Sequence, residues 1–232
     1  MTTAIILAGG SGKHWGCGLG VPKHFVPIPR PGRAPEPLLN RMVRKLRKRG
    51  AARVIISGPD DPRYALPNAE QHVRTFVPGW SGAWPYLETC HLWSTTRRTV
   101  VLLGDVVHTP EAMDAIMTPR DEWTMFGRPW HSDITGNRYG EDFAYGFGPS
   151  YHAEYILALH HVNRLYLTRQ LVRGGSWEVW RHMCGVPDER LLVLTKMPPV
   201  VRHVIIDDLT DDIDTQEDYE RLMRVREAAG AR

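Results

Sequence analysis

Glycines crowd together directly after the first apolar run of the chain. Residues 4–28 read AIILAGGSGKHWGCGLGVPKHFVPI, in which Gly9, Gly10 and Gly12 follow the apolar run and Pro22-Lys23 comes near the end. A glycine turn after a strand lets backbone N–H groups approach phosphate oxygens, because no Cβ intervenes. A lysine adds a mobile positive charge. The segment therefore predicts a phosphate-binding loop with Lys23 at its far end.

Two common phosphate-binding motifs do not fit this segment. The P-loop pattern G-x-x-x-x-G-K-[ST] fails, because Gly12-Lys13 is followed by His14 and the residue five places before Gly12 is Leu7. The dinucleotide pattern G-x-G-x-x-G would place its third glycine where Trp15 stands. A third pattern, L-A-G-G-x-G followed by a spacer and P-K, fits the chain from Leu7 onward.

Apolar runs alternate with helical patterns along the chain. Strands are predicted at residues 4–8, 54–57, 73–77, 99–103, 123–127 and 204–206, and helices at 37–49, 85–94, 110–117, from about 156 to 167, and after Thr215. Thr215 and Asp218 form a capping-box pattern. The alternation predicts an α/β fold with a mostly parallel central sheet flanked by helices, in which ligands bind at the carboxyl ends of the strands. The glycine loop and Asp105 both follow such ends.

Residues 128–199 interrupt this alternation. The stretch is rich in glycine, aromatic and polar residues before its long helical pattern. We interpret it as an insertion or lid on the acceptor side of a single domain spanning residues 1–232. Its candidate ligand contacts, with packing inside the lid as the alternative, are Trp130, Tyr139, Asp142, Phe143 and Tyr145.

Four ordered segments carry a resemblance to a known family. The glycine loop with Pro22-Lys23, EPLLNRMVRKLRKRGAARVIIS, VVLLGDVV and DDIDTQEDYERL follow one another in the chain. Together they resemble the nucleotidyltransferases that join a nucleoside triphosphate to a phosphorylated acceptor, which include the sugar-1-phosphate and molybdenum-cofactor enzymes. The resemblance implies a Rossmann-like, GT-A-like fold. It also implies an NTP and a small phosphorylated acceptor, such as a sugar phosphate, as partners.

The resemblance also assigns roles to individual residues. Lys23 contacts the phosphates, and Asp105 and Asp214 hold Mg²⁺, with Asp212 as a second choice for the latter. Such transfer rests on positioning and charge stabilisation, so Lys23, Lys13 and Asp105 are the catalytic candidates. The remaining nucleotide-binding candidates are Leu7, Ala8, Gly9, Gly10, Ser11, Gly12, His14, Gly82 and Gly104.

Two departures from the family pattern stand inside the loop. The family usually has arginine where His14 stands, and a histidine is largely neutral at pH 7. Lys13, or Lys23 alone, would then supply the missing positive charge. The spacer that ends at Val21 is also long.

Other interpretations of these residues stay open. A GT-A-type glycosyltransferase also places a metal-binding aspartate after a central strand, and a catalytically inactive nucleotide-binding module would tolerate His14. Asp105 and Asp214 could instead cap or precede helices. The basic run at 44–49 is expected to be a solvated helix face. His152 and the pair His160-His161 lack the spacing of a zinc-binding helix and are expected to be surface or packing residues.

Composition excludes several classes of protein. The 232 residues are 42% hydrophobic and carry 29 basic and 26 acidic side chains, a net charge of +3. This balance implies neither a nucleic-acid partner nor a membrane surface. No apolar run approaches the length of a membrane helix, and no signal peptide is recognised. The three cysteines show no disulfide or zinc spacing, so a cytoplasmic location is expected.

Overall fold

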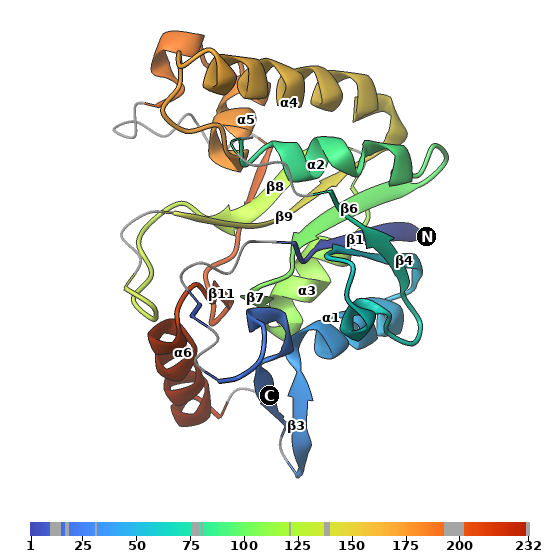
Figure 1. Ribbon diagram of the computed structural model, residues 1–232, viewed down its shortest axis with the longest axis vertical. Helices are drawn as coiled ribbons and strands as arrows, with labels where there is room; N and C mark the ends of the chain where they lie inside the picture. Colours follow the sequence, from blue (N-terminus) through green and yellow to red (C-terminus); the bar gives the residue numbers. More distant parts are fainter. Residues whose placement is uncertain are drawn as a thin grey trace.

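A seven-stranded sheet forms the centre of the computed structural model, which describes residues 1–9, 15–16, 19–30, 32–75, 79, 81–120, 122–136, 140–192 and 202–230 (Figure 1). The strand order is β10-β8-β9-β6-β1-β4-β5. These strands are β1 (Thr2–Leu7), β4 (Ala51–Gly58), β5 (Glu70–Val73), β6 (Arg98–Leu103), β8 (Thr124–Arg128), β9 (Glu141–Phe147) and β10 (His203–Ile205). All neighbouring strands pair in parallel except at β9, which runs antiparallel to both β6 and β8.

Strand β1 occupies a central place because its sequence suits burial on both faces. Its residues are TTAIIL, and every one of them is buried. β1 pairs in parallel with β4 on one side and β6 on the other, and Leu7 lies opposite both Ser57 and Leu103. The segments that follow Leu7 and Leu103 therefore leave the sheet at the same edge. One is the glycine loop and the other is Gly104-Asp105.

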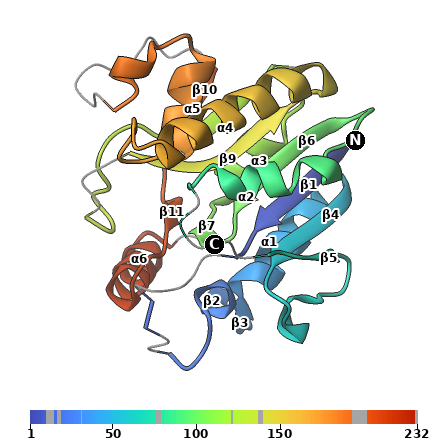
Figure 2. The same ribbon diagram turned by 45° about the horizontal axis from the view of Figure 1, so that its top comes forward.

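Helices cover both faces of the sheet (Figures 1 and 2). One buried core joins the sheet to α1 (Leu38–Lys48), α3 (Pro110–Met117) and α6 (Gln216–Ala228). The core on the other face joins it to α2 (Trp84–Glu88), α4 (His152–Leu167) and α5 (Ser176–Met183). This layered arrangement confirms the predicted α/β fold. No helix in the described part of the chain is long and apolar enough to cross a membrane.

Short elements complete the chain. Two antiparallel pairs lie outside the central sheet, β2 (Pro27–Arg30) with β3 (Arg33–Pro37) and β7 (Val106–Val107) with β11 (Asp211–Asp212). The 3₁₀ turns are η1 (Lys23–Phe25), η2 (Pro62–Tyr64), η3 (Cys90–Leu92), η4 (Pro149–Tyr151) and η5 (Asp188–Arg190).

The region 128–199 is more closely joined to the sheet than its irregular sequence suggests. It supplies β9, which lies between β8 and β6, as well as α4 and α5. β8 and β9 approach closely because two glycines lack side chains. A Cβ on Gly140 would lie 2.6 Å from the carbonyl oxygen of Arg128, and one on Gly127 would clash with the carbonyl oxygen of Glu141.

The helix signals in the sequence are confirmed at their ends. The helix predicted at 37–49 is α1, and Gly50 after it has φ +79°, a left-handed conformation that glycine adopts without strain. In the closing helix, the Thr215 hydroxyl accepts from the Asp218 N–H, and the Asp218 carboxylate accepts from the Thr215 N–H. This is the predicted capping box.

Three local predictions need correction. The strand expected at 73–77 is β5, which instead ends at Val73; residues 76 and 77 lie outside the described ranges. The helix expected at 85–94 is split into α2 and η3. The basic run is not wholly solvated either. Lys45 is buried, and its ammonium donates to the carbonyl oxygen of His108.

Candidate active site

Lys23 contacts two of the aspartates that the sequence singled out. Its Nζ lies 2.5 Å from Oδ2 of Asp105 and 3.2 Å from Oδ1 of Asp214. The Lys23 side chain is 11% exposed and that of Asp105 is 22% exposed, whereas that of Asp214 is 57% exposed. The three residues that the resemblance assigned to phosphate and metal binding therefore meet at one place.

Charge pairing holds Lys23 and Asp105 ionised. Burial alone would raise the pKa of Asp105, but the charge of Lys23 and its hydrogen bond to the carboxylate outweigh it, and the pKa is lowered below its usual value. Burial would likewise lower the pKa of Lys23, but Asp105 and then Asp214 outweigh it, so this pKa is raised. Lys23 therefore stays a cation at neutral pH, as a phosphate-binding residue must.

The small β7–β11 pair brings Asp105 and Asp214 together. Asp105 directly precedes β7, and Asp214 follows β11 by two residues. The antiparallel pairing places Asp212 opposite Val106, and the Ile213 N–H donates to the carbonyl oxygen of Asp105 over 3.1 Å. Neither aspartate caps the helix that follows it, because Thr109 caps α3 and Thr215 caps α6.

Gly104 lets Asp105 lie beside the start of the glycine loop. Its N–H donates to the carbonyl oxygen of Leu7 over 2.9 Å. A Cβ on Gly104 would lie only 2.8 Å from that same oxygen and 3.1 Å from the Cα of Ala8. A side chain here would force β1 and the Asp105 segment apart, so the glycine is required by the close approach.

The charges of this place act on three further carboxyl groups. Burial, and then the charges of Asp105 and Asp214, raise the pKa of Asp212 well above its usual value. Burial, and then Asp212, likewise raise the pKa of Glu141. Burial raises the pKa of Asp142 to about 6. Glu141 escaped the sequence analysis because its strand, β9, carries no clear strand signal, although Asp142 was an acceptor-side candidate.

Two other aspartates in the same acidic run serve the fold. Asp211 is fully buried and accepts from the guanidinium of Arg128 over 2.7 Å, as well as from the hydroxyl groups of Ser132 and Thr135. Asp208 accepts from the hydroxyl of Thr109. The run is thus divided between structural residues and residues that face Lys23.

Arg74 is a cation near the glycine loop that the sequence analysis missed. Its Nη1 lies 2.5 Å from the position that a Cβ on Gly9 would occupy, so the guanidinium packs against the glycine backbone. Its Nε donates to Glu88 over 2.9 Å, and its side chain is only 9% exposed. Its place just after β5, at the carboxyl edge of the sheet, is the signal that could have revealed it.

Of the other predicted nucleotide-binding residues, three are described by the structure and five lie outside the described ranges. Leu7 and Ala8 are buried at the end of β1, and the Ala8 N–H donates to the Ser57 carbonyl oxygen. Gly82 is exposed and packs against Gly175, whose Cα would lie 3.2 Å from an added Cβ. The residues outside the described ranges are Gly10, Ser11, Gly12, Lys13 and His14.

Two of the four aromatic acceptor-side candidates are part of the core. Phe143 and Tyr145 are buried in the cores on opposite faces of the sheet, so packing explains both. Trp130 is 41% exposed. Tyr139 lies outside the described residues.

The donor set around Lys23 fits a hard divalent cation. Asp105, Asp214 and Asp212 offer carboxylate oxygens, the ligands that Mg²⁺ and Mn²⁺ accept. Asp105 and Asp214 both contact one ammonium group, which shows that a single positive charge can reach both of them.

Solved structures with the same fold match nearly the whole chain. UDP-glucose pyrophosphorylase complexed with UDP-glucose is 10% identical, with a TM-score of 0.64 and coverage of 99% of both chains. A CTP:phosphocholine cytidylyltransferase from Streptococcus pneumoniae is 13% identical, with a TM-score of 0.58 and coverage of 97% and 98%. A Mycobacterium tuberculosis H37Rv protein in complex with manganese is 19% identical, with a TM-score of 0.54 and coverage of 96% and 97%.

The chain has the α/β fold of these nucleotide-binding transferases. The family follows from the sequence, because residues 4–161 match the model of the MobA-like NTP transferase domain. The chain belongs to this family, and it is a nucleotidyltransferase, as the four ordered segments predicted. No curated protein matches it in sequence.

Proposed function

We propose that this protein transfers a nucleoside monophosphate from an NTP to a small phosphorylated acceptor, a sugar phosphate, in a reaction that depends on Mg²⁺. The observation that carries the proposal is the contact of Lys23 with both Asp105 and Asp214 at the edge where the glycine loop leaves the sheet. In the reaction, an acceptor phosphate oxygen forms a bond to the α-phosphorus of the NTP. The bond from that phosphorus to the bridging oxygen breaks, and pyrophosphate leaves with the electron pair.

Each described residue has a distinct part in this proposal. Lys23 offsets the charge of the phosphate oxygens, and its raised pKa keeps the proton that this requires. The backbone at Gly9 approaches the triphosphate, and Arg74 beside it adds a permanent cation. Asp105 and Asp214 would hold Mg²⁺, which supplies charge stabilisation at the transferred phosphoryl group when bound.

We place the acceptor on the side of residues 128–199. Glu141 and Asp142 lie at the start of β9 and belong to this region. In addition to burial, the charge of Asp212 raises the pKa of Glu141, and that of Asp105 raises the pKa of Asp142. A phosphomonoester acceptor suits this site because a cation bound by the carboxylates would attract it. The names of the similar structures, which include UDP-glucose and phosphocholine, support a phosphorylated small molecule.

Pyrophosphate release tests the proposal. The purified protein is incubated with Mg²⁺, a panel of the common NTPs and a panel of acceptors that includes sugar 1-phosphates and phosphocholine. We expect release with one NTP and one acceptor class, and loss of at least about 100-fold in kcat/KM in Asp105→Asn. Asp133→Asn, whose carboxylate is exposed, is the matched control and should retain full activity.

Two alternatives are separated by further measurements. Silence with every NTP and acceptor, alongside normal NTP binding, would overturn the transfer reaction. Full activity of Lys23→Ala toward a nucleotide-sugar donor would favour a glycosyltransferase. Tight binding of a nucleotide that is indifferent to metal and unaltered by Asp105→Asn would favour a non-catalytic binding module.

A further inference from the structure

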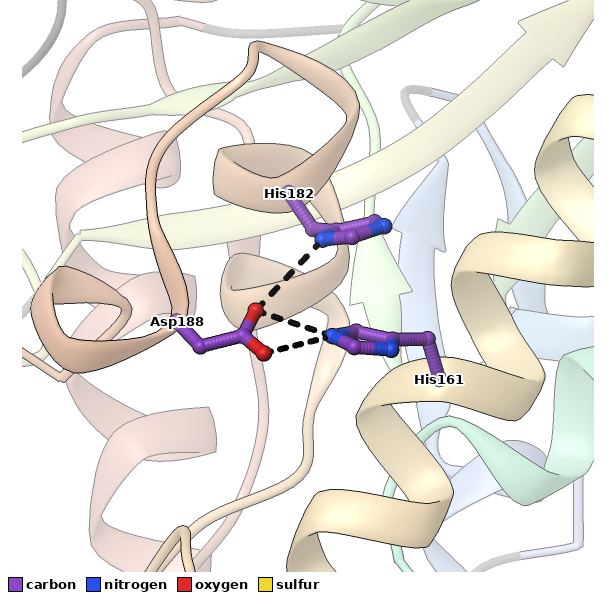
Figure 3. Close-up of side chains that lie close together, drawn as sticks. All are labelled: His161, His182 and Asp188. Atoms are coloured by element: carbon purple, nitrogen blue, oxygen red, sulfur yellow. Dashed lines mark hydrogen bonds and ion pairs between the residues drawn. The ribbon is translucent and has the colours of Figure 1, made fainter.

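Three potential metal ligands meet on the helical layer formed by α4 and α5 (Figure 3). His161 lies on α4, His182 in the last turn of α5, and Asp188 at the start of η5, and the three side chains point toward one another. They lie on the layer of α4 and α5, whereas Lys23 and its aspartates lie by the β7–β11 pair. None of the three has a part in the proposed transfer reaction.

The ligand atoms are close enough to share one ion. Nε2 of His161 lies 2.8 Å from Oδ1 and 3.0 Å from Oδ2 of Asp188, and Nδ1 of His182 lies 3.9 Å from Oδ1. Among the described residues, this is the one group of three such ligand atoms that all lie within 4.8 Å of one another. Tetrahedral zinc bonds of 2.0–2.2 Å place ligand atoms roughly 3.3 Å apart. Because an imidazole binds a metal in the plane of its ring, the stacked ring of His182 or that of His161 would have to turn for both nitrogens to reach one ion.

An ordinary hydrogen bond explains only part of the arrangement. His161 and Asp188 are satisfied as a pair, but His182 is beyond hydrogen-bond distance from the carboxylate. Its ring instead stacks on that of His161, with centroids 4.4 Å apart and an interplanar angle of 22°.

We propose that His161, His182 and Asp188 bind a divalent transition metal, with Zn²⁺ as the best-suited ion. Two imidazoles and one carboxylate form a donor set of known zinc sites, whereas Mg²⁺ prefers oxygen ligands alone. The fourth position is left to water. A surface groove of about 490 Å³, lined by His161 and His182 among others, gives it access to solvent. The bound ion would tie α4 to α5 and to η5.

The sequence concealed this site because its ligands come from different elements. A zinc helix carries two histidines one turn apart, and neither His160 nor His161 has such a partner on α4. The partner of His161 lies on α5 instead. The packing of α4 against α5, with Leu159 and Trp180 both fully buried, is what brings the two rings together.

Arg164 opposes metal binding and thereby provides a test. Its Nη2 lies 3.3 Å from Nδ1 of His161. When the guanidinium donates to Nδ1, the ring hydrogen stands on Nε2 and is donated to Asp188. Metal binding at Nε2 needs the opposite tautomer, so Arg164 must move away. Arg164 is exposed, so this movement is possible at little cost, and its removal should strengthen metal binding.

The experiment is a calorimetric titration of the chelator-treated full chain with Zn²⁺, in millimolar Mg²⁺ that saturates carboxylate sites. We expect one equivalent of Zn²⁺ to bind, and the melting temperature to rise by roughly 5 °C with excess metal. Titration with Co²⁺ should give the strong visible absorption of a tetrahedral site. Arg164→Gln should bind several-fold more tightly than the natural protein.

Variants decide which residues hold the ion. His182→Ala and Asp188→Asn should each weaken Zn²⁺ binding at least about 10-fold. His160→Ala is the matched control, because this exposed neighbour lines the same groove but is not part of the group, and its affinity should be unchanged. Asp188→Asn keeps the test valid if His182→Ala does not fold. Absence of Zn²⁺ binding to the natural protein, or undiminished binding to Asp188→Asn, would overturn the proposal.

Discussion

The ammonium group of Lys23 lies 2.5 Å from the carboxylate of Asp105, a residue that we propose as a metal ligand. The same ammonium group also contacts Asp214. The proposed phosphate-binding cation is thus held by the proposed metal-binding carboxylates. Lys23 and a divalent cation would therefore compete for Asp105 and Asp214 until phosphates arrive to accept the lysine. This competition leads to the first prediction.

Lys23→Ala should have opposite effects on metal binding and on turnover. Without nucleotide, Mn²⁺ should bind the variant more tightly than the natural protein, because the competing ammonium is gone. Turnover should fall at least about 100-fold, because the phosphate oxygens lose their cation. Calorimetry with Mn²⁺ and a pyrophosphate-release assay measure the two effects. Lys48→Ala, on the exposed side of α1, should change neither. Weaker Mn²⁺ binding to Lys23→Ala would contradict the competition.

Arg74 should contribute to nucleotide affinity rather than to the chemical step. Its guanidinium packs against Gly9 and is held by Glu88. We expect Arg74→Ala to raise the KM for the NTP roughly 10-fold, about the effect of one charge-assisted contact to phosphate, with a smaller change in kcat. Arg53→Ala is the matched control, because Arg53 also pairs with a glutamate but its side chain is 43% exposed. An unchanged KM in Arg74→Ala would place the triphosphate elsewhere.

The sequence predicted those parts of the site that follow strands or open helices. Asp105 follows the strongly apolar β6, and Asp214 comes directly before the capping box at Thr215, so local patterns located both residues, and the family resemblance gave them their expected role. Glu141 and Arg74 were not placed in this way. Glu141 begins an antiparallel strand whose residues, EDFAYGF, lack the apolar run of a buried parallel strand. Arg74 does follow β5, but the sequence analysis predicted that strand at 73–77 and so placed Arg74 inside it.

The central strands of the fold could also be predicted from local sequence patterns, whereas the edge strand could not be placed accurately. β1, β4 and β6 are buried on both faces and show it as continuous apolar sequence. β5 lies at the edge of the sheet and is only partly buried, and its strand was predicted at 73–77, too far toward the C-terminus. The burial of Lys45 was also missed, because its ammonium is satisfied by the carbonyl oxygen of His108, which is distant in sequence.

Acid should destabilise the protein through His24. Burial lowers the pKa of His24 to about 4, against a usual value of 6.5. The folded state therefore holds this ring neutral while the unfolded state takes up a proton, so stability is complete above pH 6.5 and falls as the pH drops toward 4. The loss amounts to about 3 kcal/mol from this group. His24→Gln should flatten the dependence by that amount.

Chemical denaturation at several pH values between 4 and 7 measures this effect. The difference in unfolding free energy between pH 7 and pH 4 should be smaller in His24→Gln than in the natural protein. His160→Gln, at an exposed histidine, should leave the difference unchanged. An equal difference in all three proteins would show that His24 is protonated in the folded state.

The pair of Arg128 and Asp211 should be a structural support of the site. The Asp211 side chain is fully buried and that of Arg128 is 5% exposed, and their atoms lie 2.7 Å apart. Arg128→Met would leave a buried carboxylate without its cation, which we expect to cost about 3–5 kcal/mol of unfolding free energy. The Ser132 and Thr135 hydroxyl groups that also contact Asp211 cannot replace that charge.

This loss should reach the active site through β11. Asp211 lies on β11, three residues before Asp214, and a displaced β11 would move Asp214 away from Lys23. We therefore expect Arg128→Met to lose both stability and turnover, as measured by chemical denaturation and pyrophosphate release. Arg53→Met breaks the surface pair with Glu70 and should cost no more than about 1 kcal/mol. If Arg128→Met is as stable as Arg53→Met, the hydroxyl groups suffice for Asp211, and the buried pair is not what fixes β11.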